Sequence, residues 1–111
     1  MQIEMNDLST QQLVLNLSGE MDALGCSKIR PRLEKVTDLP HPHIVMDVSQ
    51  VSFMDSSGIG AIVFLFKRLK QQQRTIEIVG VHGQPKDLMK LLRIDSAIAL
   101  SYVDEQEVQH G

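Results

Sequence analysis

The chain has 111 residues and a formal net charge of −3, and only 4% of its residues are aromatic. This length suits one domain with a single hydrophobic core over residues 1–111. The charge and the few aromatic side chains exclude nucleic acid as the expected partner, because phosphates need a basic surface and bases need stacking platforms. A single cysteine excludes an internal disulfide, and no apolar run approaches the roughly 20 residues that span a bilayer. We therefore expect a small soluble cytoplasmic domain without a secretory signal or membrane insertion.

The first part of the chain predicts two strands, a helix and a loop. An apolar strand is expected over residues 13–17, and a weaker strand over residues 3–5 pairs with it as a hairpin. Apolar residues at helical spacing predict a helix over residues 24–37. Pro31 lies inside that pattern, so either the helix begins near residue 30 or a longer helix is kinked. Two prolines within residues 39–43 predict a loop.

After this loop, strands and helices alternate. We expect strands over residues 44–48, 75–81 and 97–103, and helices over residues 58–72 and 85–93. This order predicts an α/β domain in which right-handed crossovers join parallel strands. The initial hairpin adds an antiparallel pair, so the expected sheet is mixed.

The segment Asp-Ser-Ser-Gly at residues 55–58 lies where a strand meets a helix, and two interpretations fit it. In the first, the polar side chains only cap the unpaired amides of the helix. In the second, a serine hydroxyl is modified, because free amides and the helix dipole stabilise an added phosphate. Two glycines and an alanine leave the first turn open to another protein, and the neighbouring aspartate would repel the phosphate. Modification would therefore change this surface sharply.

The helix that follows is apolar on nearly every side of its first two turns. The expected core stripe consists of Ile59, Ile62, Val63, Phe66 and Leu69. Three further residues, Ala61, Phe64 and Leu65, are apolar as well. Either the fold covers both sides of the helix, or some of these three form a docking patch for a partner protein.

Several segments resemble the STAS family of anti-sigma factor antagonists. Residues 51–60, VSFMDSSGIG, are similar to the family's phosphorylation signature, and residues 17–22 to its first loop. Residues 44–48 resemble its central strand and residues 76–81 its later strand. The resemblance covers almost the whole chain in the right order. It implies a STAS-like α/β fold, a mixed sheet of four or five strands with about four flanking helices.

The same resemblance implies a protein-binding switch without catalytic activity or cofactors. The unphosphorylated antagonist of this family binds an anti-sigma factor that is also a serine kinase, and the sigma factor is released. Phosphorylation breaks that complex, and a PPM-type phosphatase restores it. By position, the acceptor is Ser56. The residues expected on the partner-binding surface are Asp22, Asp55, Ser57, Gly58, Ile59, Ala61, Phe64 and Leu65.

The chain departs from the family pattern at three places. Members usually have glycine after the central helix, whereas residues 71–74 here read Gln-Gln-Gln-Arg. We expect a non-glycine residue to take the left-handed conformation there, at a modest cost. Arg93 and Ile94 replace a usual Gly-Leu pair, and only residues 104–109 are available for the family's C-terminal helix.

Other functions remain open. Similar stand-alone domains regulate biofilm or polysaccharide production, or serve as subunits of lipid-transport ABC complexes. A hydrolase using Ser56 or Ser57 is disfavoured, because none of the four histidines lies in a motif with a serine. His41 and His43 offer two nitrogens to a metal without a third ligand, so no metal site is expected.

Overall fold

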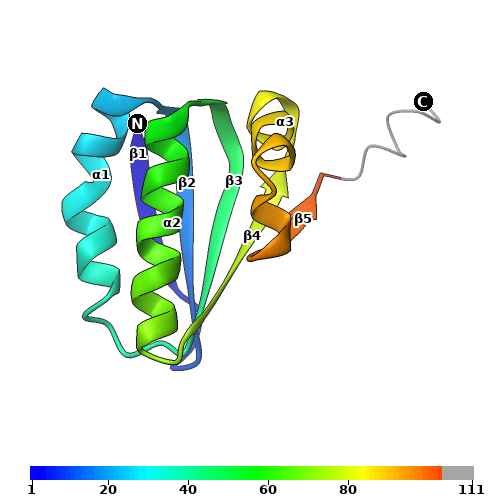
Figure 1. The fold of residues 1–111 in the computed structure, drawn as a ribbon. Coiled ribbons are helices and arrows are strands. Elements are labelled where there is room, and N and C mark those ends of the chain that lie inside the picture. Colours follow the sequence, from blue (N-terminus) through cyan, green and yellow to red (C-terminus); the bar gives the residue numbers. More distant parts are fainter. Residues whose placement is uncertain (104–111) are drawn as a thin grey trace.

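The computed structural model describes residues 1–103 as a five-stranded sheet in the order β1-β2-β3-β4-β5, with helices packed against it (Figure 1). The strands are β1 (Gln2–Asp7), β2 (Gln12–Met21), β3 (His43–Met54), β4 (Thr75–Val81) and β5 (Ala99–Tyr102). The helices are α1 (Ala23–Val36), α2 (Ser56–Gln71), α3 (Gly83–Leu91) and the short 3₁₀ helix η1 (Ile94–Ser96). Only β1 runs antiparallel to its neighbour, so the predicted mixed sheet is confirmed.

The helix count differs slightly from the expectation of about four. Within residues 1–103 there are three α-helices and the single turn η1. The expected C-terminal helix over residues 104–109 lies outside the described residues. No helix in the described part of the chain is long and apolar enough to cross a membrane.

The core lies between the sheet and the helix pair α1 and α2, which stand side by side (Figure 1). Alternate residues of β2 show how the strand builds it. Leu13, Leu15 and Leu17 are at most 2% exposed, whereas Val14 and Asn16 between them are half-buried. Successive side chains of a strand point to opposite faces, so one face of β2 supplies the core. Helix α1 packs on β1 and β2, and α2 packs on β3 and β4.

Helix α1 resolves the conflict at Pro31 in favour of the longer helix. It begins after Asp22 and continues through Pro31 to Val36. A proline removes the hydrogen bond to the carbonyl four residues earlier, here that of Ser27. Both Ser27 and Pro31 are exposed, so water can replace the lost donor.

The buried stripe of α2 overlaps the predicted one, which is confirmed at Ile62 and Leu69. Its buried residues are Gly58, Ile62, Leu65 and Leu69, whereas Ile59, Val63 and Phe66 are half-buried. Leu65 is 0% exposed, so its expected place on the partner surface is wrong. The buried stripe is the side of α2 that packs on β3 and β4, whereas Ala61 and Phe64 line the cavity beside α1.

Two helix ends use non-glycine residues with positive φ. Gln73 follows α2 with φ 59° and Arg93 follows α3 with φ 57°. The amide of Gln73 donates to the Lys70 carbonyl and that of Arg74 to the Leu69 carbonyl, which is the Schellman pattern. The expectation of a left-handed non-glycine residue after the central helix is confirmed.

The leucines of α3 and of the residue after it are not buried together. Leu88 is half-buried, whereas Leu91 is 76% exposed and Leu92 47% exposed. Pro85 and Met89 are the buried residues instead. The helix ends at Leu91 and Arg93 then turns the chain, so Ile94 rather than Leu92 enters the core.

Candidate functional site

Two aspartates begin two neighbouring helices at the same end of the sheet (Figure 1). The Oδ1 atom of Asp22 accepts a hydrogen bond from the amide of Gly25 at 2.7 Å, at the start of α1. The Oδ1 atom of Asp55 accepts one from the amide of Ser57 at 2.8 Å, at the start of α2. The backbone joins the two starts, because the amide of Asp55 donates to the Met21 carbonyl at 3.3 Å. The two N-cap residues therefore belong to one surface.

The two serines occupy different environments on this surface. Ser56 is the first residue of α2 and is exposed, whereas Ser57 is half-buried. Because Asp55 is the N-cap residue, neither serine hydroxyl performs that role. Among residues 1–103, neither hydroxyl is hydrogen-bonded to another protein group. The exposed hydroxyl of Ser56 is therefore free to enter the active site of another protein.

The two glycines of the first turn of α2 have opposite surroundings. A Cβ atom on Gly58 would lie 2.6 Å from the Cγ of Met54 and 2.9 Å from the Cβ of Met21. Gly58 thus brings α2 close to the ends of β2 and β3, and it is buried rather than part of the exposed surface. A Cβ atom on Gly60 would meet nothing within 4 Å. Of the two glycines, Gly60 leaves the surface bare, and Gly58 acts through packing.

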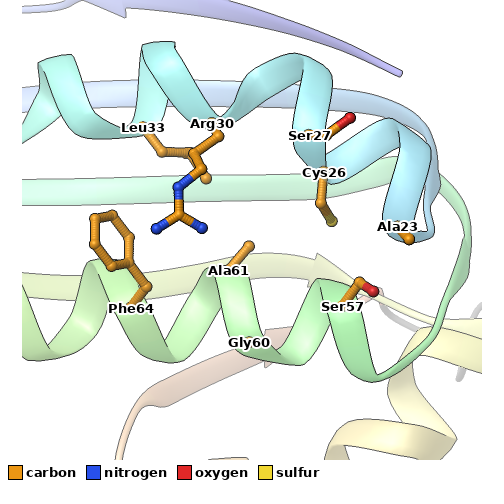
Figure 2. Close-up of a pocket in the computed structure, with 9 residues that line it drawn as sticks. All are labelled: Ala23, Cys26, Ser27, Arg30, Leu33, Ser57, Gly60, Ala61 and Phe64. Atoms are coloured by element: carbon orange, nitrogen blue, oxygen red, sulfur yellow. The ribbon is translucent and has the colours of Figure 1, made fainter.

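A cavity of about 410 Å³ opens between α1 and α2 beside the serines (Figure 2). Most of its lining side chains are small. From α1 the lining residues are Ala23, Cys26, Ser27, Arg30 and Leu33, and from α2 they are Ser57, Gly60, Ala61 and Phe64. Three expected site residues, Ser57, Ala61 and Phe64, therefore share one hollow.

At the end of the cavity away from Ser57, an aromatic ring lies close to two cations. The guanidinium carbon of Arg30 lies 5.1 Å from the ring centroid of Phe64, and that of Arg68 lies 5.2 Å from it. Arg30 also bonds to Glu34 at 3.3 Å in an exposed ion pair. Guanidinium groups over a ring face are attracted by its quadrupole. The α1–α2 cavity thus offers apolar surface with positive charge at one end.

Cys26 faces this cavity from α1 (Figure 2). Burial raises the pKa of its thiol above the ordinary 9.0, and the negative charges of Asp55 and Asp22 raise it further. A thiol with a raised pKa is mostly protonated at neutral pH and is a poor nucleophile. The same carboxylates would meet a phosphate on Ser56 with like charge.

The described histidines are bonded away from the serines. His41 contacts Asp7 at 3.0 Å, His43 contacts Glu77 at 2.8 Å, and His82 contacts the Ser49 carbonyl at 2.9 Å. Residues 1–103 contain no group of three or more His, Cys, Asp or Glu side chains placed to hold a metal ion.

The sequence pattern identified the α2 side of the cavity and missed the α1 side. Cys26, Ser27 and Arg30 carry no motif, and their placement across the cavity from α2 depends on how the two helices pack. The available signal in the sequence for the α1 side was the helical spacing of the small residues Ala23, Cys26 and Ser27, because small side chains on one side of a helix leave room between helices.

Known proteins share this fold and part of this sequence. A family model described as STAS domain matches residues 2–107. The "Anti-sigma-B factor antagonist" of Listeria monocytogenes is 28% identical over 102 residues, which cover 92% of this chain and 90% of that protein. A crystal structure of an anti-sigma factor antagonist from Mycobacterium paratuberculosis has a TM-score of 0.83 at 18% identity, covering 98% of this chain and 92% of that one.

The phosphorylated form of the Bacillus cell fate determinant SpoIIAA has a TM-score of 0.72 at 16% identity, covering 98% of each chain. At such identities the solved structures establish a common fold. The family model spans nearly the whole chain, from β1 to beyond β5. The protein therefore belongs to the STAS domain family.

Proposed function

We propose that this protein is an anti-sigma factor antagonist whose binding is switched by phosphorylation of Ser56. The observation that carries the proposal is the exposed hydroxyl at the first position of α2, left free because Asp55 caps the helix. A relative from Listeria monocytogenes bears the name of an anti-sigma-B factor antagonist, and SpoIIAA, which has a phosphorylated form, shares the fold.

The unmodified protein binds an anti-sigma factor that is also a serine kinase. Its contact surface consists of the capped helix starts and the α1–α2 cavity, with Asp22, Asp55, Ser57, Ile59, Ala61 and Phe64 as the expected contacts. The cavity accepts an apolar side chain of the partner, and Arg30 and Arg68 at its end favour a nearby carboxylate. When the anti-sigma factor occupies this surface, it releases the sigma factor.

Phosphorylation of Ser56 ends that complex by charge and size. A phosphoserine carries about −1.5 to −2 charge at pH 7. The amides at the start of α2 stabilise the phosphate in the free protein, while Asp55 beside it concentrates negative charge at one spot. Inside a contact with the kinase, this charge would lose its water and face whatever group had accepted the neutral hydroxyl. A PPM-type phosphatase then restores the binding form.

The test uses the full chain as bait and identifies a bound partner by its kinase activity. Wild-type protein retains a serine kinase that, with ATP, adds one phosphate to the bait, as measured by intact mass. Ser56→Ala binds the same kinase and gains no phosphate, and Ser56→Asp does not bind it. Ser57→Ala keeps Ser56 and still gains one phosphate, and the matched control Ser101→Ala, exposed on β5, behaves like wild type in both assays.

Two outcomes contradict the proposal. Full phosphorylation of Ser56→Ala would show that the acceptor lies elsewhere, with Ser57 the first candidate. Retention of a transporter ATPase or a biofilm regulator by wild type, without any serine kinase, would assign the domain to a different circuit.

A further inference from the structure

Within residues 1–103, the last part of β3 has no strand partner on one of its two edges. The pairing of β3 with β4 ends at Asp47 and Val79. Its pairing with β2 continues to Met54 opposite Met21. On the edge of residues 48–54 that faces away from β2, the backbone amides and carbonyls therefore have no β4 residue to bond to. Such groups need hydrogen-bond partners when they are shielded from water.

Two side chains from the start of α3 take the place of the missing strand. The ring of His82 is bonded through Nε2 to the carbonyl oxygen of Ser49 at 2.9 Å. The Oε1 atom of Gln84 accepts from the amide of Met54 at 2.8 Å, and its Nε2 atom donates to the Met54 carbonyl at 2.7 Å. A carboxamide has the same donor and acceptor as a peptide group. Gln84 thus pairs with Met54 as a neighbouring strand residue would.

This contact fixes the backbone just before Ser56. Met54 is held by Gln84 from the β4 side, and the next residue, Asp55, donates from its amide to the Met21 carbonyl on the β2 side at 3.3 Å. The chain is therefore bonded on both sides immediately before α2 begins. The position of the Ser56 hydroxyl depends on this support, because Ser56 itself makes no hydrogen bond through its side chain within residues 1–103.

We propose that Gln84 is a positioning residue that holds the Met54–Ser56 segment in the form presented to the kinase. The inference rests on the proposed phosphorylation of Ser56. Phosphoryl transfer needs the attacking hydroxyl held in line with the phosphate, and small misplacements of a reacting group cost large factors in rate. Gln84 touches neither ATP nor the hydroxyl. It acts only through the peptide group of Met54.

Both atoms of the carboxamide are required. Gln84→Ala removes both bonds, and water then competes for the peptide group because residue 84 is exposed. Gln84→Glu keeps an acceptor for the Met54 amide but places a carboxylate oxygen against the Met54 carbonyl at the 2.7 Å contact. Two acceptors at that distance repel, so the isosteric change also displaces the segment.

Gln72 supplies a matched control at the other end of the molecule. Its Nε2 atom donates to the Thr37 carbonyl at 2.8 Å, and its Oε1 atom accepts from Arg74 at 2.7 Å. Gln72→Ala therefore also removes one donated and one accepted hydrogen bond, the accepted one from a guanidinium rather than a peptide amide, far from Ser56 along the sheet. A loss of phosphorylation that reflects only lower stability will follow the measured free energy of unfolding of each variant.

The experiment compares wild type, Gln84→Ala, Gln84→Glu and Gln72→Ala as full chains, with the kinase captured by wild type and with ATP. We expect kcat/KM for phosphorylation of Ser56 to fall about tenfold or more in both Gln84 variants and to change less than about twofold in Gln72→Ala. Amide hydrogen exchange at Met54 should become about tenfold faster in Gln84→Ala and stay unchanged in Gln72→Ala.

The outcomes separate this inference from the proposed function. Equal kcat/KM values for Gln84→Ala and Gln72→Ala, with Ser56 phosphorylated normally, overturn the positioning role alone. Unchanged exchange at Met54 in Gln84→Ala overturns it as well, without any kinase. A wild-type chain that its bound partner never phosphorylates at Ser56 overturns the proposed function, and the positioning role with it.

Discussion

The carboxylate of Asp55 accepts a hydrogen bond from the amide of Ser57 at 2.8 Å, and within residues 1–103 the hydroxyl of Ser56 has no hydrogen-bond partner. An aspartate that caps the helix beside Ser56 has two effects that can be separated. It stabilises α2 through a hydrogen bond, and it sets the charge around any phosphate through its carboxylate.

Substitution of Asp55 should separate the cap from the charge. Asp55→Ala loses the N-cap bond and should lower the free energy of unfolding by about 1 kcal/mol. Asp55→Asn keeps an oxygen acceptor and should stay within about 0.5 kcal/mol of wild type. Urea denaturation measures both values. Equal destabilisation by the two substitutions would show that the charge, not the hydrogen bond, stabilises α2.

Glycine at Gln73 should stabilise the protein. Gln73 has φ 59°, a conformation that costs a non-glycine residue energy and costs glycine little. Gln73→Gly should raise the free energy of unfolding by about 0.5–1 kcal/mol. The control is Gln71→Gly, inside the last turn of α2, which should lower it by about 0.5–1 kcal/mol. Thermal unfolding should therefore move in opposite directions for the two variants.

Arg74 joins the end of α1, the loop at His41 and the start of β4, at the end of the sheet opposite the serines. Its Nε atom donates to the His41 carbonyl at 2.6 Å, and one terminal nitrogen donates to the Val36 carbonyl at 3.2 Å, at the end of α1. Burial lowers the pKa of this guanidinium, which remains charged at neutral pH. Arg74→Ala should cost about 1.5–3 kcal/mol, and Arg74→Lys should recover little because an ammonium cannot reproduce the fork.

An exposed cation provides the comparison for Arg74. Lys67→Ala on α2 should change the unfolding free energy by less than about 0.5 kcal/mol. If chemical denaturation shows that Arg74→Ala destabilises the protein as little as Lys67→Ala, the contacts of Arg74 with the carbonyls of His41, Val36 and Thr37 contribute nothing to stability.

Leu65 and Phe64 are neighbours on α2 with different tasks. Leu65 is fully buried, so Leu65→Ala should cost about 2–5 kcal/mol of stability. Phe64 lines the α1–α2 cavity, so Phe64→Ala should cost less stability but weaken partner binding about tenfold. Calorimetric titration against the captured kinase measures the second effect. Unaltered affinity in Phe64→Ala would remove the cavity from the docking surface.

The thiol of Cys26 should be unreactive and should make stability fall at high pH. Its pKa in the folded protein is raised by burial and by Asp55 and Asp22, so the folded state keeps its proton longer than the unfolded state does. The stability that this difference in pKa contributes is therefore fully present below pH 9.0 and is lost as pH rises through the folded-state pKa. At pH 8, iodoacetamide should alkylate Cys26 more slowly than it alkylates the thiol of glutathione.

Removal of a nearby charge checks this explanation. Asp55→Asn should lower the pKa of Cys26 and speed its alkylation. Slower alkylation in that variant would contradict the role of the carboxylate in raising the pKa.

Local sequence determined most of the secondary structure and the position of the capped serines. The segment before Ser56 and the apolar helix after it have strong local patterns, and Asp55 is a good cap in any context. The left-handed residue after α2 followed from the resemblance, because members of the family usually have glycine where Gln73 takes φ 59°.

Only the tertiary structure decided which side chains of α2 face solvent. Leu65 and Phe64 are equally apolar, and which of them is buried was decided by the packing of α2 on β3 and β4 and beside α1. Gln84 carried no motif, because its contact with Met54 arises from the unequal reach of β3 beside β2 and β4. Contacts between residues distant in sequence depend on how far strands extend and how helices cross, and no local propensity contains that information.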